Sequence, residues 1–268
     1  MLPTFIIIGA MKSGTSSLYH YLNAHPDICM STVKETDYFV EAKNYSRGPA
    51  WYESLFTREA KQYGEASPNY TKLPLHKGVP QRMHAVVPGA KLIYVLRDPV
   101  ERMLSQYAHN FAKGRETRRL NEALKPRSMN NYLLTSSYHT QLKAFLDYYP
   151  MDRILVISAE DLRVNRRPTV RRVFEFLDVD PSFDSPVFDN QFHATERKYT
   201  NGFSLEWLIP NKKLLFAMRN VVSCQFTKPV PPDKELDEAT KGLLVEALRP
   251  DIDALRRLTG ERFEQWCV

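Results

Sequence analysis

The sequence predicts an α/β fold in which a mainly parallel sheet is flanked by helices. Two observations carry this prediction. Three short apolar runs have the composition of buried parallel strands, and segments with helical features separate them along the chain. Strands that alternate with helices are typical of parallel sheets. The 268 residues, 43% hydrophobic and 25% charged, suffice for a single domain, which we expect to span 1–268.

The predicted strands are the runs TFIII at 4–8, KLIYVL at 91–96 and RILVIS at 153–158. The first run ends at Gly9, and the tripeptide RDP follows the second. Ligands of open parallel sheets bind beyond the carboxyl ends of the strands. We therefore expect the functional site where these runs end.

Five segments have the periodicity or the end signals of helices: 16–24, 99–112, 130–149, 168–177 and 236–258. Pro99 suits the first turn of the second segment, and we expect the last segment to be interrupted near Pro250. The stretch from 180 to about 210 is rich in Pro, Asp, Asn and Phe. We expect an irregular C-terminal region at 180–232 that forms a lid or a wall of the substrate site.

The formal net charge of +6 favours anionic partners. The basic clusters at 115–119 and 163–172 are short and lack interleaved aromatic residues, so nucleic acid is not expected. No apolar run approaches the ~20 residues of a membrane span, and no signal-peptide pattern precedes the first strand. Three widely spaced cysteines indicate neither a disulfide framework nor a zinc site. We expect a cytoplasmic protein without a membrane partner.

The loop after the first strand, GAMKSGTSSL at 9–18, has the composition of a phosphate-binding loop. A glycine-rich turn into a helix presents free backbone N–H groups and the positive end of the helix dipole. Lys12 adds a mobile positive charge. The other candidate phosphate-binding residues are Ser13, Gly14, Thr15, Ser16 and Ser17. A plain strand-to-helix turn with capping serines is the alternative.

The lysine of this loop stands in an unusual place. Nucleoside triphosphatases follow G-x-x-x-x-G-K-[ST], and the lysine after the second glycine serves the β and γ phosphates. Here Thr15 follows Gly14, and the loop's lysine is Lys12. A metal-binding aspartate is not evident, since Asp98 lies beside Arg97. We therefore expect a donor whose leaving group is one 5′-phosphate, stabilised by lysine without a metal.

Two phosphate motifs in this order resemble those of one family. GAMKSGTSSL resembles the 5′-phosphosulfate loop of sulfotransferases that use 3′-phosphoadenosine 5′-phosphosulfate (PAPS). YVLRDPVERMLSQYAH at 94–109 resembles their 3′-phosphate motif, and SSYHTQLKAFLDYYP at 136–150 is similar to a helix of the heparan-sulfate-type branch. That branch includes bacterial and polyketide-synthase domains. The resemblance covers nearly the whole chain and implies a P-loop-like fold, PAPS as co-substrate and no metal.

The resemblance assigns the 3′-phosphate of the donor to Arg97 and Ser105. Arginine binds phosphate through two hydrogen bonds, and Ser105 follows about two helical turns later. The stretch FHATERKYTNG at 192–202 loosely matches a basic loop of the family, which implies that Arg197 and Lys198 contact the same phosphate. A surface ion pair and an ordinary helix serine are the alternatives for Arg97 and Ser105, and a solvated charge pair is the alternative for Arg197 and Lys198.

Sulfuryl transfer to an alcohol needs a base for the hydroxyl proton. The heparan-sulfate-type branch uses a glutamate in a KE-x-H-x-F segment, and VKETDYFVE at 33–41 places Lys34 and Glu35 on the lysine and the glutamate. Asp37 takes the histidine position and Val40 a later acidic position, so the match supports Glu35 as the base more than it indicates how the acceptor is held. A solvated charged turn is the alternative.

The resemblance also implies that four residues line the acceptor site: Lys34, Asp37, Glu65 and Ser67. For the last two, a turn before Pro68 is the alternative. His109, His139 and His193 are rival candidates for the base, because neutral histidine accepts a proton near neutral pH.

We therefore expect a PAPS-dependent O-sulfotransferase. Its acceptor is a small-molecule alcohol or a polyketide or β-hydroxyacyl group on an acidic acyl carrier protein. The alternative acceptor is an anionic polysaccharide or glycosaminoglycan. Two other classes stay open. A nucleotide-dependent kinase would require ATP and Mg²⁺, and a non-catalytic nucleotide-binding module would bind PAPS without turnover.

Overall fold

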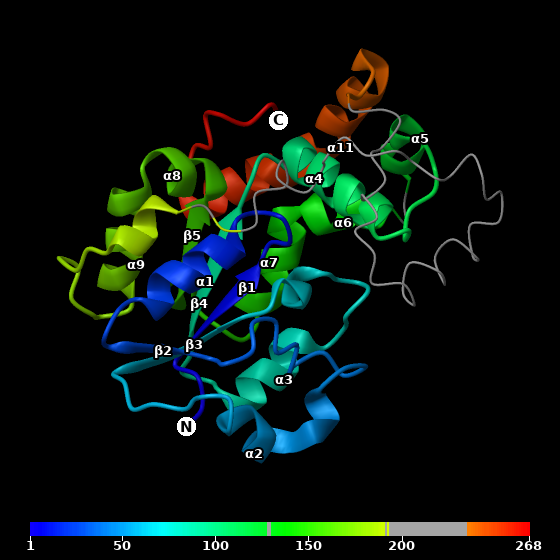
Figure 1. Cartoon of the computed structure of the whole chain (residues 1–268). Coiled ribbons are helices and arrows are strands. Elements are labelled where there is room, and N and C mark those ends of the chain that lie inside the picture. The colour runs from blue at the N-terminus through cyan, green and yellow to red at the C-terminus, as the bar shows by residue number, and fades with distance from the viewer. Residues whose placement is uncertain (128–129, 191, 193–234) are drawn as a thin grey trace, which may run out of the picture.

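The computed structural model describes residues 1–127, 130–190, 192 and 235–268 (Figure 1). At its centre lies a five-stranded sheet in the order β2-β3-β1-β4-β5, with every neighbouring pair parallel. The strands are β1 (Phe5–Gly9), β2 (Ile28–Met30), β3 (Gln62–Ala66), β4 (Lys91–Leu96) and β5 (Ile154–Ser158). The predicted α/β fold with a parallel sheet flanked by helices is confirmed.

Helices connect and cover the strands. They are α1 (Thr15–Asn23), α2 (Gly48–Glu53), α3 (Val79–Val86), α4 (Pro99–Ala112), α5 (Leu120–Leu124), α6 (Asn131–Ser136), α7 (Tyr138–Leu146), α8 (Ala159–Val164), α9 (Arg166–Phe176) and α11 (Glu238–Thr259). The short 3₁₀ helices are η1 (Tyr45–Arg47), η2 (Pro68–Thr71), η3 (Met151–Arg153) and η4 (Pro186–Asp189). No helix in the described part of the chain is long and apolar enough to cross a membrane.

Alternate residues of the central strand enter two separate cores. Phe5 and Ile7 pack on one face of the sheet with the apolar residues of α1 and α9. Ile6 and Ile8 pack on the other face, in the core that α4, α7 and α11 share. Burial on both faces explains why this strand is a continuous apolar run.

Two strands were not predicted. β2 has only three residues, and β3 contains Gly64 and Glu65, which are uncommon in strands. Gly64 is required by packing, since a Cβ there would lie 2.0 Å from the Phe5 ring. The order of the sheet therefore depends on contacts that strand propensity does not reveal.

Two predicted helices differ from the structure. The segment 130–149 contains two helices, α6 and α7, which are separated at Ser137. The predicted interruption near Pro250 is wrong, because α11 runs continuously through it. The buried face of α11, with Leu248 and Ile252 on either side of the proline, packs against α7 and α4 and keeps the helix whole. Most of the expected lid at 180–232 lies outside the described residues.

Candidate active site

The loop between β1 and α1 lies at the carboxyl end of the sheet and is tied to the neighbouring strand. The Ala10 N–H donates to the Val95 carbonyl of β4 over 2.6 Å. A Cβ at position 9 would lie 2.1 Å from Thr71 Oγ1, so only Gly9 fits there. The backbone of Gly14 has a φ of 91°, in the left-handed region that glycine adopts without strain. These contacts fix the sharp turn into α1.

The start of α1 is a place for an anion. The first N–H groups of a helix lack intrahelical partners and carry the positive end of the dipole. Ser13 beside them is fully buried, and within the described part of the chain its Oγ has no hydrogen-bond partner. Buried hydroxyls are normally bonded, so this oxygen suits an oxygen of a bound phosphate or sulfate. Lys12, with a φ of 73°, supplies a cation in the same loop.

The hydroxyls of the first turn of α1 are not equivalent. Ser17 Oγ accepts from the Phe192 N–H over 3.2 Å and lies 3.4 Å from the Phe192 carbonyl. Thr15 is buried, whereas Ser16 is partly exposed. Ser17 is therefore already engaged by the chain, and Ser16 is accessible from solvent.

A buried arginine that the sequence analysis did not single out lies under this loop. Arg102 is 0% exposed, and its guanidinium donates to the Met11 carbonyl over 3.4 Å. Three further donations, each of 2.7 Å, go to the neutral oxygens of Gln106, Ser136 and Tyr132. Burial lowers the pKa of Arg102, but arginine stays charged in proteins. Neutral partners do not cancel this charge, so it adds to the positive potential at the loop.

The second predicted phosphate motif lies where β4 ends and α4 begins. Arg97 directly follows β4, and its guanidinium pairs with Glu101 over 3.1 Å. Asp98 caps α4, because its Oδ1 accepts from the N–H of Val100 and of Glu101, both over 2.9 Å. Ser105 lies further along α4 and is 8% exposed. The carboxylate of Asp98 therefore caps the helix, and the two predicted contacts for the 3′-phosphate lie just before α4 (Arg97) and within it (Ser105).

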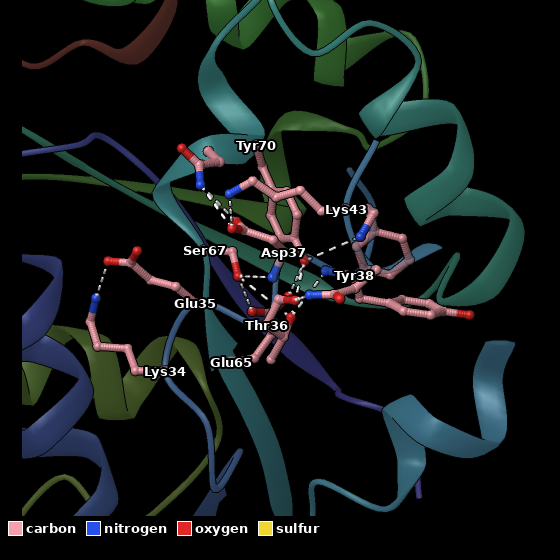
Figure 2. Close-up of polar contacts among 12 residues, drawn as sticks. Lys34, Glu35, Thr36, Asp37, Tyr38, Lys43, Glu65, Ser67 and Tyr70 are labelled. Atoms are coloured by element: carbon pink, nitrogen blue, oxygen red, sulfur yellow. Dashed lines mark hydrogen bonds and ion pairs between the residues drawn. The ribbon is translucent and has the colours of Figure 1, made fainter. Parts of the chain in front are cut away.

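Glu35, the candidate base, lies in a turn beyond β2. The Lys34 ammonium donates to its Oε1 over 2.9 Å, and the Glu35 side chain is 51% exposed (Figure 2). Partial burial acts to raise the pKa of Glu35, but the charge and hydrogen bond of Lys34, followed by the charges of Lys72 and Lys43, outweigh it and lower this pKa. The carboxylate is therefore ionised at neutral pH and accessible to a substrate.

Asp37, two residues after Glu35, is buried, whereas Glu35 is half exposed. Asp37 is 5% exposed, and the Lys43 ammonium pairs with it. The Asn69 amide donates to both of its oxygens over 2.9 Å. Glu35 and Asp37 both have a positive φ, 64° and 48°. For residues other than glycine this costs on the order of 1–3 kcal/mol each, so other contacts must stabilise the turn.

Glu65 and Ser67, which were predicted to line the acceptor site, are both buried, each 0% exposed. Their role at that site stays a prediction. The Glu65 carboxylate accepts the hydroxyl of Ser67 over 2.6 Å. It also accepts the hydroxyls of Tyr70 and Tyr52 over 2.6 and 3.0 Å. Burial raises the pKa of Glu65, while these hydroxyl donors oppose the rise.

A cavity of about 560 Å³ begins at Met11 in the loop. Its charged lining residues are Lys72, Arg115, Glu116, Arg118 and Arg127. Glu116 and Arg118 pair with each other over 2.7 Å. Burial and then the charges of Arg102 and Lys43 lower the pKa of Lys72 to about 8. The cavity lining therefore has an excess of positive charge, from residues that sequence motifs did not indicate.

Two of the remaining candidates, His109 and His139, lie on helices. His109 lies in the last turn of α4, and the backbone N–H of His139 at the start of α7 donates to Asp251. His193, Arg197 and Lys198 lie outside the described residues. Their predicted roles as rival base and as 3′-phosphate contacts stay predictions.

The chain is similar in sequence and in structure to sulfotransferases. The family model described as "Sulfotransferase domain" matches residues 2–213. A bacterial sulfotransferase from Alicyclobacillus acidocaldarius superposes with a TM-score of 0.72 at 26% identity, with 99% of each chain covered.

Two curated relatives carry heparan sulfate in their names. The human bifunctional heparan sulfate N-deacetylase/N-sulfotransferase 2 is 31% identical over 202 residues, which are 67% of this chain and 22% of the relative. The mouse heparan sulfate glucosamine 3-O-sulfotransferase 3A1 is 32% identical over 207 residues, 74% of this chain and 50% of the relative. The chain thus spans half or less of the length of these relatives.

Proposed function

The chain belongs to the sulfotransferase domain family, and from this membership we propose that it transfers a sulfuryl group from PAPS to the hydroxyl of an acceptor. The observation that carries the proposal is the anion site at the start of α1. There the helix N–H groups and Lys12 come together with the buried Ser13 hydroxyl, which has no hydrogen-bond partner among the described residues. These residues fit the 5′-phosphosulfate of the donor, which supplies the sulfuryl group when bound.

The chain's own residues have distinct tasks in this reaction. Lys12 and the N–H groups of α1 bind the 5′-phosphate, where negative charge grows as the sulfuryl group leaves. Arg97 and Ser105 bind the 3′-phosphate. Glu35 accepts the hydroxyl proton of the acceptor at a carboxylate oxygen, since this carboxylate is ionised and accessible. The buried guanidinium of Arg102 adds to the positive electrostatic potential at the loop.

The donor assignment predicts a preference for 3′-phosphoadenosine 5′-phosphate over AMP. A hydrogen bond to a charged group contributes about 1.5–3 kcal/mol, or roughly ten- to a hundredfold in affinity. Calorimetry with both nucleotides measures this preference, and Arg97→Ala is expected to remove most of it. Equal affinities of the unaltered protein for the two nucleotides would contradict the assignment.

Glu101→Gln is the matched control for this experiment. It removes the carboxylate that pairs with Arg97 over 3.1 Å but leaves the guanidinium in place. We expect Glu101→Gln to keep the preference for the 3′-phosphate. A loss of preference in both variants would indicate a disturbed start of α4 rather than a phosphate contact.

The cation-rich cavity supports an acceptor that carries negative charge. Opposite charge attracts and orients a substrate before reaction. The heparan sulfate relatives favour an anionic saccharide, and an acidic carrier protein that presents a hydroxyacyl group is the second candidate. Label transfer from PAPS to heparan sulfate, to dextran and to a hydroxyacyl-loaded carrier protein separates these acceptors from a neutral alcohol.

If Lys72 binds the acceptor, use of an anionic acceptor will fall as the pH rises through about 8. The lowered pKa of Lys72, about 8, means that its positive charge is lost in this range. Arginine stays charged, so Lys72→Arg is expected to flatten the alkaline limb of kcat/KM. A neutral acceptor serves as the control, because its kcat/KM does not depend on this charge. An alkaline limb that is identical in Lys72→Arg would contradict the role.

A further inference from the structure

The carboxylate of Glu65 is the centre of a buried hydroxyl network. It accepts from Ser67 Oγ over 2.6 Å, from the Tyr70 hydroxyl over 2.6 Å and from the Tyr52 hydroxyl over 3.0 Å. Figure 2 shows Glu65, Ser67 and Tyr70 to one side of Glu35, whose side chain points away from them toward Lys34. The network therefore does not contact the exposed carboxylate itself.

Two of these hydroxyls continue to the backbone of the turn. Ser67 Oγ accepts the Asp37 N–H over 3.0 Å, and the Tyr70 hydroxyl accepts the Phe39 N–H over 3.4 Å. On the other side of the turn, the Glu35 N–H donates to the carbonyl of Ala66, the residue between Glu65 and Ser67. The end of β3 thus holds the turn at positions 35, 37 and 39.

The hydroxyl hydrogen bonds of this network all point toward the Glu65 carboxylate. Ser67, Tyr70 and Tyr52 all donate to the carboxylate oxygens of Glu65, so each of these hydroxyls directs its proton inward. The oxygens of Ser67 and Tyr70 are then left with lone pairs for the N–H groups of Asp37 and Phe39. An amide in place of the carboxylate would donate to one of these oxygens and compete with the backbone for it.

We propose that Glu65 is a positioning residue for Glu35, which acts through Ser67 and Tyr70 to fix the left-handed turn that presents the base. The role of Glu35 as base is part of the proposed function, so this inference rests on that function. The fixed turn itself is a property of the fold.

The test compares two variants that each remove one hydroxyl from Glu65. Ser67→Ala removes the hydroxyl that links Glu65 to the Asp37 N–H. Tyr52→Phe removes a hydroxyl that donates to the same carboxylate and keeps the aromatic ring. Misplacement of a reacting group by about 1 Å costs up to about 10²-fold in rate, so we expect Ser67→Ala to lower kcat by roughly 10- to 100-fold. Tyr52→Phe is expected to leave kcat unchanged, and both variants keep the affinity for 3′-phosphoadenosine 5′-phosphate.

A second measurement separates positioning from stability. In the Ser67→Ala background, Glu35→Gln should cost much less than it costs alone, because the base is already misplaced. In the Tyr52→Phe background Glu35→Gln should keep its full cost. Independent effects of Ser67→Ala and Glu35→Gln, or equal kcat values for Ser67→Ala and Tyr52→Phe, would overturn the proposal.

Hydrogen exchange of the backbone amides measures how firmly the turn is held, independently of enzyme activity. Backbone N–H groups at 35–39 should exchange faster in Ser67→Ala and in Glu65→Gln, and at the unaltered rate in Tyr52→Phe. Unchanged exchange in Ser67→Ala overturns the network as a restraint on the turn. If the unaltered protein sulfates no acceptor, the proposed function and the role in catalysis fail, while the exchange result still decides whether Glu65 holds the turn.

Discussion

Glu35→Gln is expected to lower kcat by about 10²- to 10⁴-fold, the usual contribution of a general base. Glutamine keeps the size of the side chain but cannot take the hydroxyl proton. Affinity for 3′-phosphoadenosine 5′-phosphate and the unfolding midpoint should stay unchanged, because half of this side chain lies in solvent. Steady-state kinetics with PAPS and a saturating acceptor, together with calorimetry, measure both.

The pH profile gives an independent check on the base. A base must be ionised to act, and the pKa of Glu35 lies below its ordinary value of 4.5 because nearby lysines outweigh partial burial. Protonation of Glu35 itself should therefore reduce the rate only at pH values below 4.5. A histidine base would instead lose activity near its own pKa of about 6.5.

Glu41→Gln is the matched control for Glu35→Gln. Glu41 belongs to the same segment and pairs with Arg82 over 3.3 Å, but its side chain is 79% exposed. We expect the kcat of Glu41→Gln to equal that of the unaltered protein. If Glu35→Gln retains nearly full turnover while a variant of His109, His139 or His193 loses it, the base is that histidine.

Lys12→Ala is expected to lower kcat by about 10²- to 10³-fold, as loss of one stabilising donor does when charge develops in the transition state. Donor affinity should fall far less, since Ser13, the N–H groups of α1 and Arg97 still bind the nucleotide. The measurement is kcat and the calorimetric affinity for 3′-phosphoadenosine 5′-phosphate in the same preparation. EDTA is expected to leave the rate of the unaltered protein unchanged.

Lys61→Ala is the control for Lys12→Ala. Lys61 precedes β3, at the amino end of the sheet, so its loss removes one positive charge away from the loop. Equal rates for both variants would indicate a general effect of net charge. A strict requirement for Mg²⁺ would favour the kinase alternative.

The sequence was sufficient to predict the fold because its strands have a clear pattern. β1, β4 and β5 are apolar runs buried on both faces, and such runs are evident without a structure. β3 is buried as well, but its sequence QYGEA contains a glycine required by the Phe5 ring and a glutamate that accepts the hydroxyl of Tyr52 from another element. No local pattern reveals such contacts.

Some residues of the candidate site could likewise be predicted from the sequence, and others could not. The loop with Lys12 and the exposed Glu35 belong to contiguous motifs, so their positions could be predicted from the sequence. Glu65 was predicted to line the site, and its side chain is fully buried. This burial could not be predicted, because a motif gives a position along the chain and not the side of the sheet that a residue faces. Arg102 and Lys72 come from other segments, and only the tertiary structure brings their charges to the loop.

The buried guanidinium beneath the loop has a practical consequence for handling the protein. Arg102 and the buried Ser13 hydroxyl favour small tetrahedral oxyanions as well as nucleotides, and helix starts bind sulfate and phosphate readily. Ammonium sulfate carried over from precipitation, or a phosphate buffer, will compete with the donor and raise its apparent KM. Dialysis into a chloride buffer before any assay removes this competition, and titrating sulfate back in measures how strongly the loop binds it.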